Sequence, residues 1–163
     1  MQNKKEKIKM PEINSKAPYF KLHAGDGQEY SLDDFKGKKI VLYFYPKDST
    51  AGCTKQALGF AENNDIFVKN NAVIIGINKD SVSSHAKFAE KYSLPFILLS
   101  DPEKKVIEDY GVWQEKKMCG KTSMGIVRTT FIINEEGKIE KIFEKVKADG
   151  HAQEVLNYMG IVK

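Results

Sequence analysis

Three apolar runs that alternate with segments of helical periodicity constrain the fold of this chain more than any other feature. The runs read KKIVLYFYP (38–46), AVIIGIN (72–78) and PFILLS (95–100), and they are rich in β-branched and aromatic residues. Such continuous hydrophobicity is typical of strands that are buried on both faces of a sheet. The segments 52–69 and 81–92 lie between the runs and carry apolar residues at helical spacing. This order predicts one α/β domain built of layers.

The two ends of the chain add hairpins and helices. Residues 19–32 read as two short strands around a turn at 25–27, followed by a short helix that Ser31 caps. The remaining expected elements are a helix over 103–111, a loop over 115–123, a hairpin over 125–145 and a helix over 151–160. The polar residues 1–16 read as a flexible tail, so we expect the folded domain to span 17–163.

Composition and charge argue against several classes of protein. A chain of 163 residues has the size of one domain, and no apolar run approaches the roughly 20 residues of a membrane-spanning helix. The basic N-terminus lacks the apolar segment of a secretory signal, so a cytoplasmic location is the expectation. The net charge is +4, but the chain has no basic helical face and no RNA-type aromatic motif. We therefore expect neither nucleic acid nor a membrane as a partner.

Cysteine and histidine are too sparse to indicate a metal centre. The two cysteines, Cys53 and Cys119, are too few for a closed zinc site or a disulfide scaffold. The three histidines, His23, His85 and His151, share no ligand spacing. We expect no metal ion and no cofactor.

Cys53 stands where a thiol is readily ionised. It opens the helix that follows the first apolar run, and the unpaired N–H groups of a helix N-terminus favour a thiolate. Pro46, Thr50 and Cys53 form the pattern Pro-x-x-x-Thr-x-x-Cys, and Arg128 is the only arginine in the chain. One sulfur nucleophile, one hydroxyl and one guanidinium make a reaction centre for a small polar substrate.

Two segments carry a family resemblance. Residues 39–60 are similar to the active-site segment of peroxiredoxins, and GVWQEKKMCGKTSMGIVRTTFIINEEGKI (111–139) resembles a later signature of the bacterioferritin comigratory protein, or peroxiredoxin Q, group. The resemblance covers residues 17–163. It implies a single-domain thioredoxin-like fold with a central mixed β-sheet flanked by helices and an N-terminal β-hairpin. It also implies a thiol-dependent peroxidase that reduces hydrogen peroxide and small organic hydroperoxides through a sulfenic acid on Cys53.

The resemblance also implies roles for single residues. Thr50, Arg128 and the backbone N–H groups near Gly52 and Cys53 would stabilise the charge that develops on the leaving oxygen, and Pro46 would shield the thiolate.

Two further positions near the motif have open or altered roles. Tyr43 either lines the pocket or packs in the core. Gln56 stands where relatives commonly have glutamate. Because an amide carries no negative charge, Gln56 would orient the arginine more weakly than a glutamate would. A thiol such as thioredoxin or glutaredoxin would be the reductant, and the enzyme would be a monomer or a homodimer.

The chain departs from the group at its second cysteine. Many members carry one five residues after the first, where this chain has Leu58. Other relatives place it in the next helix, where this chain has serines at 81, 83 and 84. A one-cysteine enzyme is therefore the expectation. Cys119, in the expected loop, is the candidate for an atypical resolving cysteine, within one chain or across a dimer.

Two other functions stay open at this point. A thiol–disulfide oxidoreductase on the same fold normally needs Cys-x-x-Cys, and the position three after Cys53 is Gln56. A redox sensor would use oxidation of Cys53 as a signal, and it would react once instead of turning over.

Overall fold

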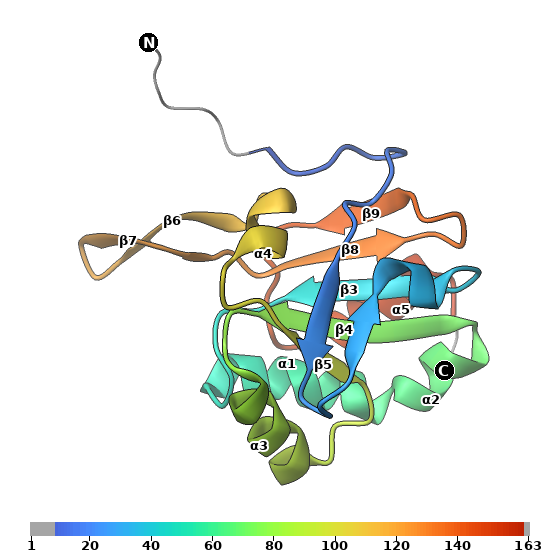
Figure 1. The fold of residues 1–163 in the computed structure, drawn as a ribbon, viewed down its shortest axis with the longest axis horizontal. Helices are drawn as coiled ribbons and strands as arrows, with labels where there is room; N and C mark the ends of the chain where they lie inside the picture. Colours follow the sequence, from blue (N-terminus) through green and yellow to red (C-terminus); the bar gives the residue numbers. More distant parts are fainter. Residues whose placement is uncertain (1–8, 162–163) are drawn as a thin grey trace.

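A mixed seven-stranded sheet forms the centre of the computed structural model, which describes residues 9–161 (Figure 1). The strands are β1 (Lys21–Ala24), β2 (Glu29–Ser31), β3 (Lys39–Phe44), β4 (Ala72–Asn78), β5 (Ile97–Ser100), β8 (Thr129–Ile133) and β9 (Ile139–Phe143). A separate two-stranded sheet consists of β6 (Trp113–Met118) and β7 (Lys121–Ile126). The helices are η1 (Leu32–Phe35, a 3-10 helix), α1 (Ala51–Glu62), α2 (Asn64–Lys69), α3 (Val82–Tyr92), α4 (Lys105–Asp109) and α5 (His151–Tyr158).

The strand order is β2-β1-β5-β4-β3-β8-β9. The three apolar runs of the sequence form β3, β4 and β5, and these strands are parallel to one another. β1 joins β5 and β8 joins β3 in antiparallel fashion, and β1–β2 is the expected N-terminal hairpin. The expected α/β fold with a mixed central sheet is confirmed.

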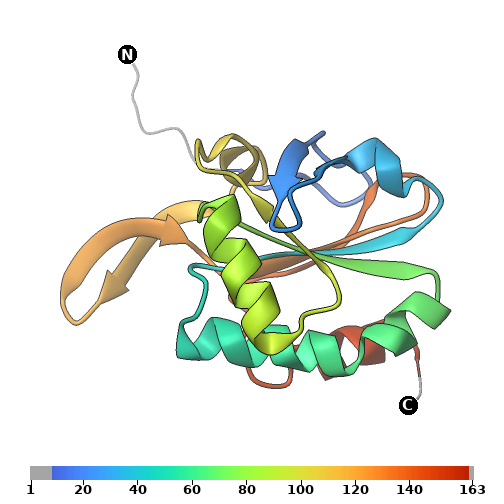
Figure 2. The same ribbon diagram turned by 60° about the horizontal axis from the view of Figure 1, so that its bottom comes forward.

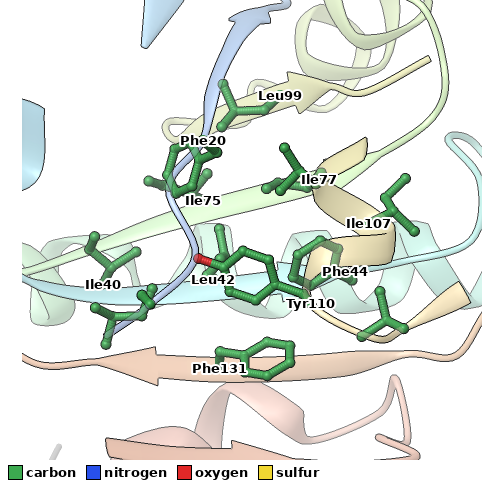
Figure 3. Packing of buried hydrophobic residues seen from close by; sticks show 14 of the residues in the cluster. Phe20, Ile40, Leu42, Phe44, Ile75, Ile77, Leu99, Ile107, Tyr110 and Phe131 are labelled. Atoms are coloured by element: carbon green, nitrogen blue, oxygen red, sulfur yellow. The ribbon is translucent and has the colours of Figure 1, made fainter. Parts of the chain in front are cut away.

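The sheet is buried on both faces. Along β3, Ile40, Leu42 and Phe44 pack in one hydrophobic cluster, whereas Val41 and Tyr43 pack in the other. The first cluster includes residues of the N-terminal segment, η1 and α4 (Ala17, Phe35 and Val106), and Figure 3 shows the packing of its side chains. The second is covered by α1, α2, α3 and α5, and Figure 2 shows α1, α2 and α5 together on this side of the sheet. This double burial is why β3 reads as an uninterrupted apolar run.

The helix expected over 52–69 is two helices in the structure. It breaks at Asn63, whose φ and ψ of −107° and 5° end α1. The Asn63 side chain donates to the Gly59 carbonyl at 2.8 Å, while the Asn63 backbone N–H bonds to Phe60. A side chain that takes the place of the backbone donor in this way competes with the helix, and α2 starts in a new direction.

The expectation of a loop over 115–123 is wrong, because residues 113–126 form the β6–β7 hairpin. Cys119 and Gly120 are its two turn residues, and both have positive φ, 52° and 79°, as a tight two-residue hairpin turn requires. The hairpin extends away from the body of the protein (Figures 1 and 2). Its polar composition hid the strands, because a hairpin that leaves the body has little apolar surface to bury.

Backbone bonds attach the residues just before β1 to the far edge of the sheet. Asn14 N–H donates to Ile139 at 2.7 Å, and Ile139 N–H donates to Ser15 at 2.9 Å. These contacts involve the last residues of the segment that we expected to be a flexible tail, 1–16, while 1–8 lie outside the described residues. Within 9–161, no helix is both long and apolar enough to cross a membrane.

Candidate active site

Strand register brings two distant parts of the sequence to the same end of the sheet. β3 and β8 are antiparallel with Phe44 opposite Thr129, so Arg128, one residue earlier, lies beyond the carboxyl end of β3. The chain leaves β3 through residues 45–50 and enters α1, whose third residue is Cys53. Arg128 therefore faces the first turn of α1. It lies just before β8 and not within the strand that we expected to contain it.

The guanidinium of Arg128 connects the thiol to a buried amide. Arg128 Nη2 lies 3.4 Å from Cys53 Sγ, and Arg128 Nη1 donates to Gln56 Oε1 at 2.5 Å. Cys53 and Gln56 stand three residues apart on α1, so both face the same side of the helix. The positive charge and the N-terminus of α1 both act on the sulfur, and each stabilises negative charge there.

Close packing limits what can reach the sulfur. Cys53 is only 1% exposed. A Cβ added to Gly52 would lie 3.3 Å from Arg128 Nη2, so the glycine gives the guanidinium room over the first turn of the helix.

The loop residues of the motif lie beside this centre. Pro46 is half-buried at the end of β3, and Thr50 is exposed at the N-cap position of α1. Thr50 Oγ1 donates to the Lys47 carbonyl at 2.9 Å. The hydroxyl hydrogen thus stays within the loop, so Thr50 is not placed to stabilise the leaving oxygen as a donor, the role that the resemblance implied. Its oxygen keeps lone pairs that can accept a hydrogen bond from a substrate.

Tyr43 lies in the core of the protein. It is fully buried, and its ring packs against Phe60 with centroids 4.8 Å apart. Gly76 of β4 makes room for it, since a Cβ there would come within 3.0 Å of the ring. The Tyr43 hydroxyl has no hydrogen-bond partner among residues 9–161, and burial raises the pKa of Tyr43 well above its ordinary value.

Three residues that the sequence did not single out surround the site. Lys116 of β6 donates to the Ile126 carbonyl at 2.8 Å, and burial followed by the charge of Arg128 lowers the pKa of Lys116. His151, the first residue of α5, is buried, and Asp48 is buried in the loop between β3 and α1. The signal for Asp48 was present in the sequence as a charged residue between Pro46 and Thr50.

Cys119 lies at the tip of the β6–β7 hairpin, far from Cys53. Both cysteines are free thiols, and Cys119 is exposed. Along an extended strand of about 3.3 Å per residue, Cys119 stands about 20 Å from Ile126, the end of β7 nearest Arg128. A disulfide needs Cα atoms within about 7 Å, so the two thiols of one chain are not placed to react with each other.

The described part of the chain, 9–161, contains no group of three His, Cys, Asp or Glu side chains that could hold a metal ion.

Comparison with known proteins shows the family of this chain. Residues 13–142 match the AhpC/TSA family. The peroxiredoxin Bcp of Bacillus subtilis is 49% identical over 145 residues, which cover 89% of this chain and 92% of that protein.

Solved structures of peroxiredoxins are similar to this chain in fold and sequence. The bacterioferritin comigratory protein of Xanthomonas campestris, studied for its alkyl peroxide reduction activity, matches with a TM-score of 0.82 and 38% identity over 86% of this chain and 90% of that one. A Cys-to-Ser mutant of Xylella fastidiosa peroxiredoxin Q matches with a TM-score of 0.88 and 33% identity over 93% of this chain and 97% of that one.

Proposed function

This chain belongs to the AhpC/TSA family as a peroxiredoxin of the Bcp, or peroxiredoxin Q, group, and we propose that it reduces hydrogen peroxide and small organic hydroperoxides through the thiol of Cys53. Peroxiredoxins reduce peroxides at the expense of a thiol. The distance of 3.4 Å between Arg128 Nη2 and Cys53 Sγ is the observation that supports the assignment most strongly.

The chemical step is a displacement at oxygen. The Cys53 thiolate attacks one peroxide oxygen, an S–O bond forms and the O–O bond breaks. Sulfur is oxidised to sulfenic acid, and the departing oxygen takes a proton and leaves as water or an alcohol. Arg128 is placed to stabilise negative charge on the oxygens, because its guanidinium already contacts the sulfur and is held by Gln56.

The loop and the helix terminus complete the substrate site in this proposal. Thr50 Oγ1 accepts a hydrogen bond from the peroxide, and the backbone N–H groups of Gly52 and Cys53 lie in the first turn of α1, where they have no partner within the helix. Pro46 covers the thiol from the side of β3. Tyr43 takes no part, since it is enclosed in the core.

The sulfenic acid is resolved by an external thiol. Leu58 stands on α1 where many relatives have a second cysteine, and Cys119 lies at the tip of a protruding hairpin. An incoming thiol such as that of thioredoxin or glutaredoxin forms a mixed disulfide with Cys53 and releases water. A second thiol then restores the Cys53 thiol by exchange.

A turnover assay tests this function. The wild type should consume hydrogen peroxide continuously with excess dithiothreitol, Cys53→Ser should consume none, and Cys119→Ser should match the wild type. Turnover that survives Cys53→Ser would refute the assignment. A wild type that consumes one equivalent and then stops would indicate the redox sensor. Reduction of a disulfide substrate without peroxide would indicate the oxidoreductase.

A further inference from the structure

The carboxylate of Asp48 is a buried junction between four side chains. Its Oδ1 accepts from the Tyr45 hydroxyl at 2.6 Å and from Asn78 Nδ2 at 3.3 Å. Its Oδ2 accepts from the Ser84 hydroxyl at 2.7 Å and lies 2.6 Å from His85 Nδ1. These partners come from the end of β3, the end of β4 and the first turn of α3. Burial by itself would raise the pKa of Asp48, but the bonds from His85, Tyr45 and Ser84 outweigh it and lower that pKa.

His85 meets an acceptor at each ring nitrogen. Nδ1 faces the Asp48 carboxylate, and Nε2 lies 3.0 Å from the Leu99 carbonyl. The Leu99 carbonyl can only accept, so Nε2 donates to it, and Nδ1 shares a hydrogen bond with the Asp48 carboxyl group. His85 is fully buried, and the Asp48 side chain is only 3% exposed. The two are joined by a short hydrogen bond inside the protein, and losing either partner would leave a buried polar atom of the other without its bond.

Asp48 also fixes the backbone of the loop that carries the peroxiredoxin motif. Asp48 N–H donates to Asp80 Oδ2 at 2.8 Å. The next residue, Ser49, takes the left-handed conformation with φ of 64°, and the one after it, Thr50, bonds back to Lys47. A side chain at φ above zero is strained and persists only where its surroundings hold it. The contacts of Asp48 supply that restraint.

We propose that the Asp48–His85 pair positions the loop between β3 and α1, and that through this loop it sets Pro46 and Thr50 over the Cys53 thiol. This inference rests on the proposed peroxidase function. Among residues 9–161, the side chain that bonds to the sulfur is Arg128, so Asp48 and His85 are positioning residues. A misplacement of about 1 Å can slow a reaction about 100-fold when reactants must be aligned.

The test compares two reactions of the same thiol. Reaction with hydrogen peroxide needs Pro46 and Thr50 in place, whereas alkylation by iodoacetamide, read as the adduct on Cys53 in a Cys119→Ser background, needs a reactive and accessible thiolate but no alignment with those two residues. We expect Asp48→Asn and His85→Gln to slow the peroxide reaction about 10- to 100-fold while alkylation keeps its wild-type rate. The double variant should be no slower than either single variant, because the two residues act as one unit.

Asp101→Asn is the matched control. Asp101 is also a buried aspartate, but its carboxylate accepts from the Ile107 N–H at the start of α4, away from the loop. The Asp101→Asn variant should be less stable than the wild type and should react with peroxide at the wild-type rate. An Asp48→Asn variant with the wild-type peroxide rate would overturn the proposal. So would one in which both reactions slow equally, since that would be a change in the thiol itself.

Ser84→Ala removes a single donor from Asp48 and decides the question if Asp48→Asn does not fold. It should fold and slow the peroxide reaction in preference to alkylation, and an unchanged rate would overturn the proposal. A wild type without peroxide turnover would refute the peroxidase function itself, and the Cys53→Ser comparison separates that result from failure of the positioning role.

Discussion

Arg128 contacts the Cys53 sulfur at 3.4 Å although 75 residues separate the two in sequence. The contact depends on the β3–β8 register, which sets the residue before β8 beside the first turn of α1. It joins the only arginine of the chain to the cysteine of the peroxiredoxin motif. The catalytic proposal can be tested at each end of this contact and in the shell around it.

Arg128→Ala should slow the peroxide reaction by roughly 100- to 1,000-fold, the usual effect of removing one donor that stabilises a developing charge. The rise of the rate with pH should also move to higher pH, because a positive charge beside the sulfur is lost. Arg128→Lys should recover only part of the rate, since an ammonium lacks the fork that bonds Gln56 and the sulfur together. Stopped-flow peroxide kinetics measure both effects, with Lys121→Ala as the control for a lost surface charge. An unchanged pH–rate profile would remove Arg128 from the site.

Gln56→Met should slow the peroxide reaction with little loss of stability. Gln56 Oε1 holds Arg128, but its buried Nε2 has no partner among the described residues. The substitution removes the acceptor that orients Arg128, which costs stability. It also removes a buried donor without a partner, whose penalty of about 1–3 kcal/mol offsets that loss. Urea unfolding and peroxide kinetics on the same samples separate the two effects. Wild-type peroxide kinetics would mean that Arg128 needs no partner on α1.

Cys119→Ser should leave the oxidation product unchanged. After one equivalent of hydrogen peroxide, dimedone should label Cys53 in both the wild type and the variant, because the hairpin holds Cys119 about 20 Å from the end of β7 nearest the site. Intact-mass analysis distinguishes the cases. A loss of two hydrogens in the wild type, with the adduct only in the variant, would make Cys119 the resolving thiol.

Tyr43→Phe should leave the peroxide rate unchanged and leave the protein as stable as before or more so. The hydroxyl it removes is buried without a partner, and such a group costs about 1–3 kcal/mol. The ring contacts with Phe60 are kept. Thermal unfolding and peroxide kinetics check the two parts. A slower peroxide reaction would place the Tyr43 hydroxyl in the substrate pocket.

Acidification should destabilise the protein through His151. Burial lowers the pKa of His151 below its ordinary 6.5, against the opposing effect of Glu154. The unfolded chain therefore binds the proton first. The stability contributed by the neutral ring is complete above about pH 6.5 and is lost as the pH falls through the pKa of the folded state.

Urea unfolding between pH 7.5 and pH 5 tests this expectation. The slope due to His151 can reach at most about 1.4 kcal/mol per pH unit, and His151→Gln should flatten the curve by that contribution. Thr130 and Glu154, which bond the two ring nitrogens at 2.8 Å each, stay in place in the variant. An equal slope in both proteins would assign the pH dependence to other groups.

Local patterns predicted most of the fold. The runs that became β3, β4 and β5 carry their own signal, because a strand buried on both faces must be apolar throughout. Ser31 stands at the start of η1 as expected. Ser81 stands likewise at the start of α3, where its hydroxyl accepts from Ser84 N–H at 3.1 Å. A cap needs only its own neighbours, so it can be predicted from a few residues.

Two features of the fold were not predicted, because local sequence preference and the structure disagree there. The β6–β7 hairpin consists largely of polar and charged residues, and its strands follow from the turn at Cys119–Gly120 and not from an apolar face. The break between α1 and α2 depends on whether the Asn63 side chain bonds to the Gly59 carbonyl, a choice that periodicity does not reveal.

The sequence by itself determined where the thiol of the motif stands. The Pro-x-x-x-Thr-x-x-Cys pattern sets a thiol in the first turn of a helix, and local spacing is enough for that. Only the tertiary structure decided which groups surround the thiol. Strand register brought Arg128 to Cys53, and the packing of α3 against the sheet brought His85 to Asp48. Such contacts between distant segments depend on how the strands pair and the layers stack, and no local pattern encodes them.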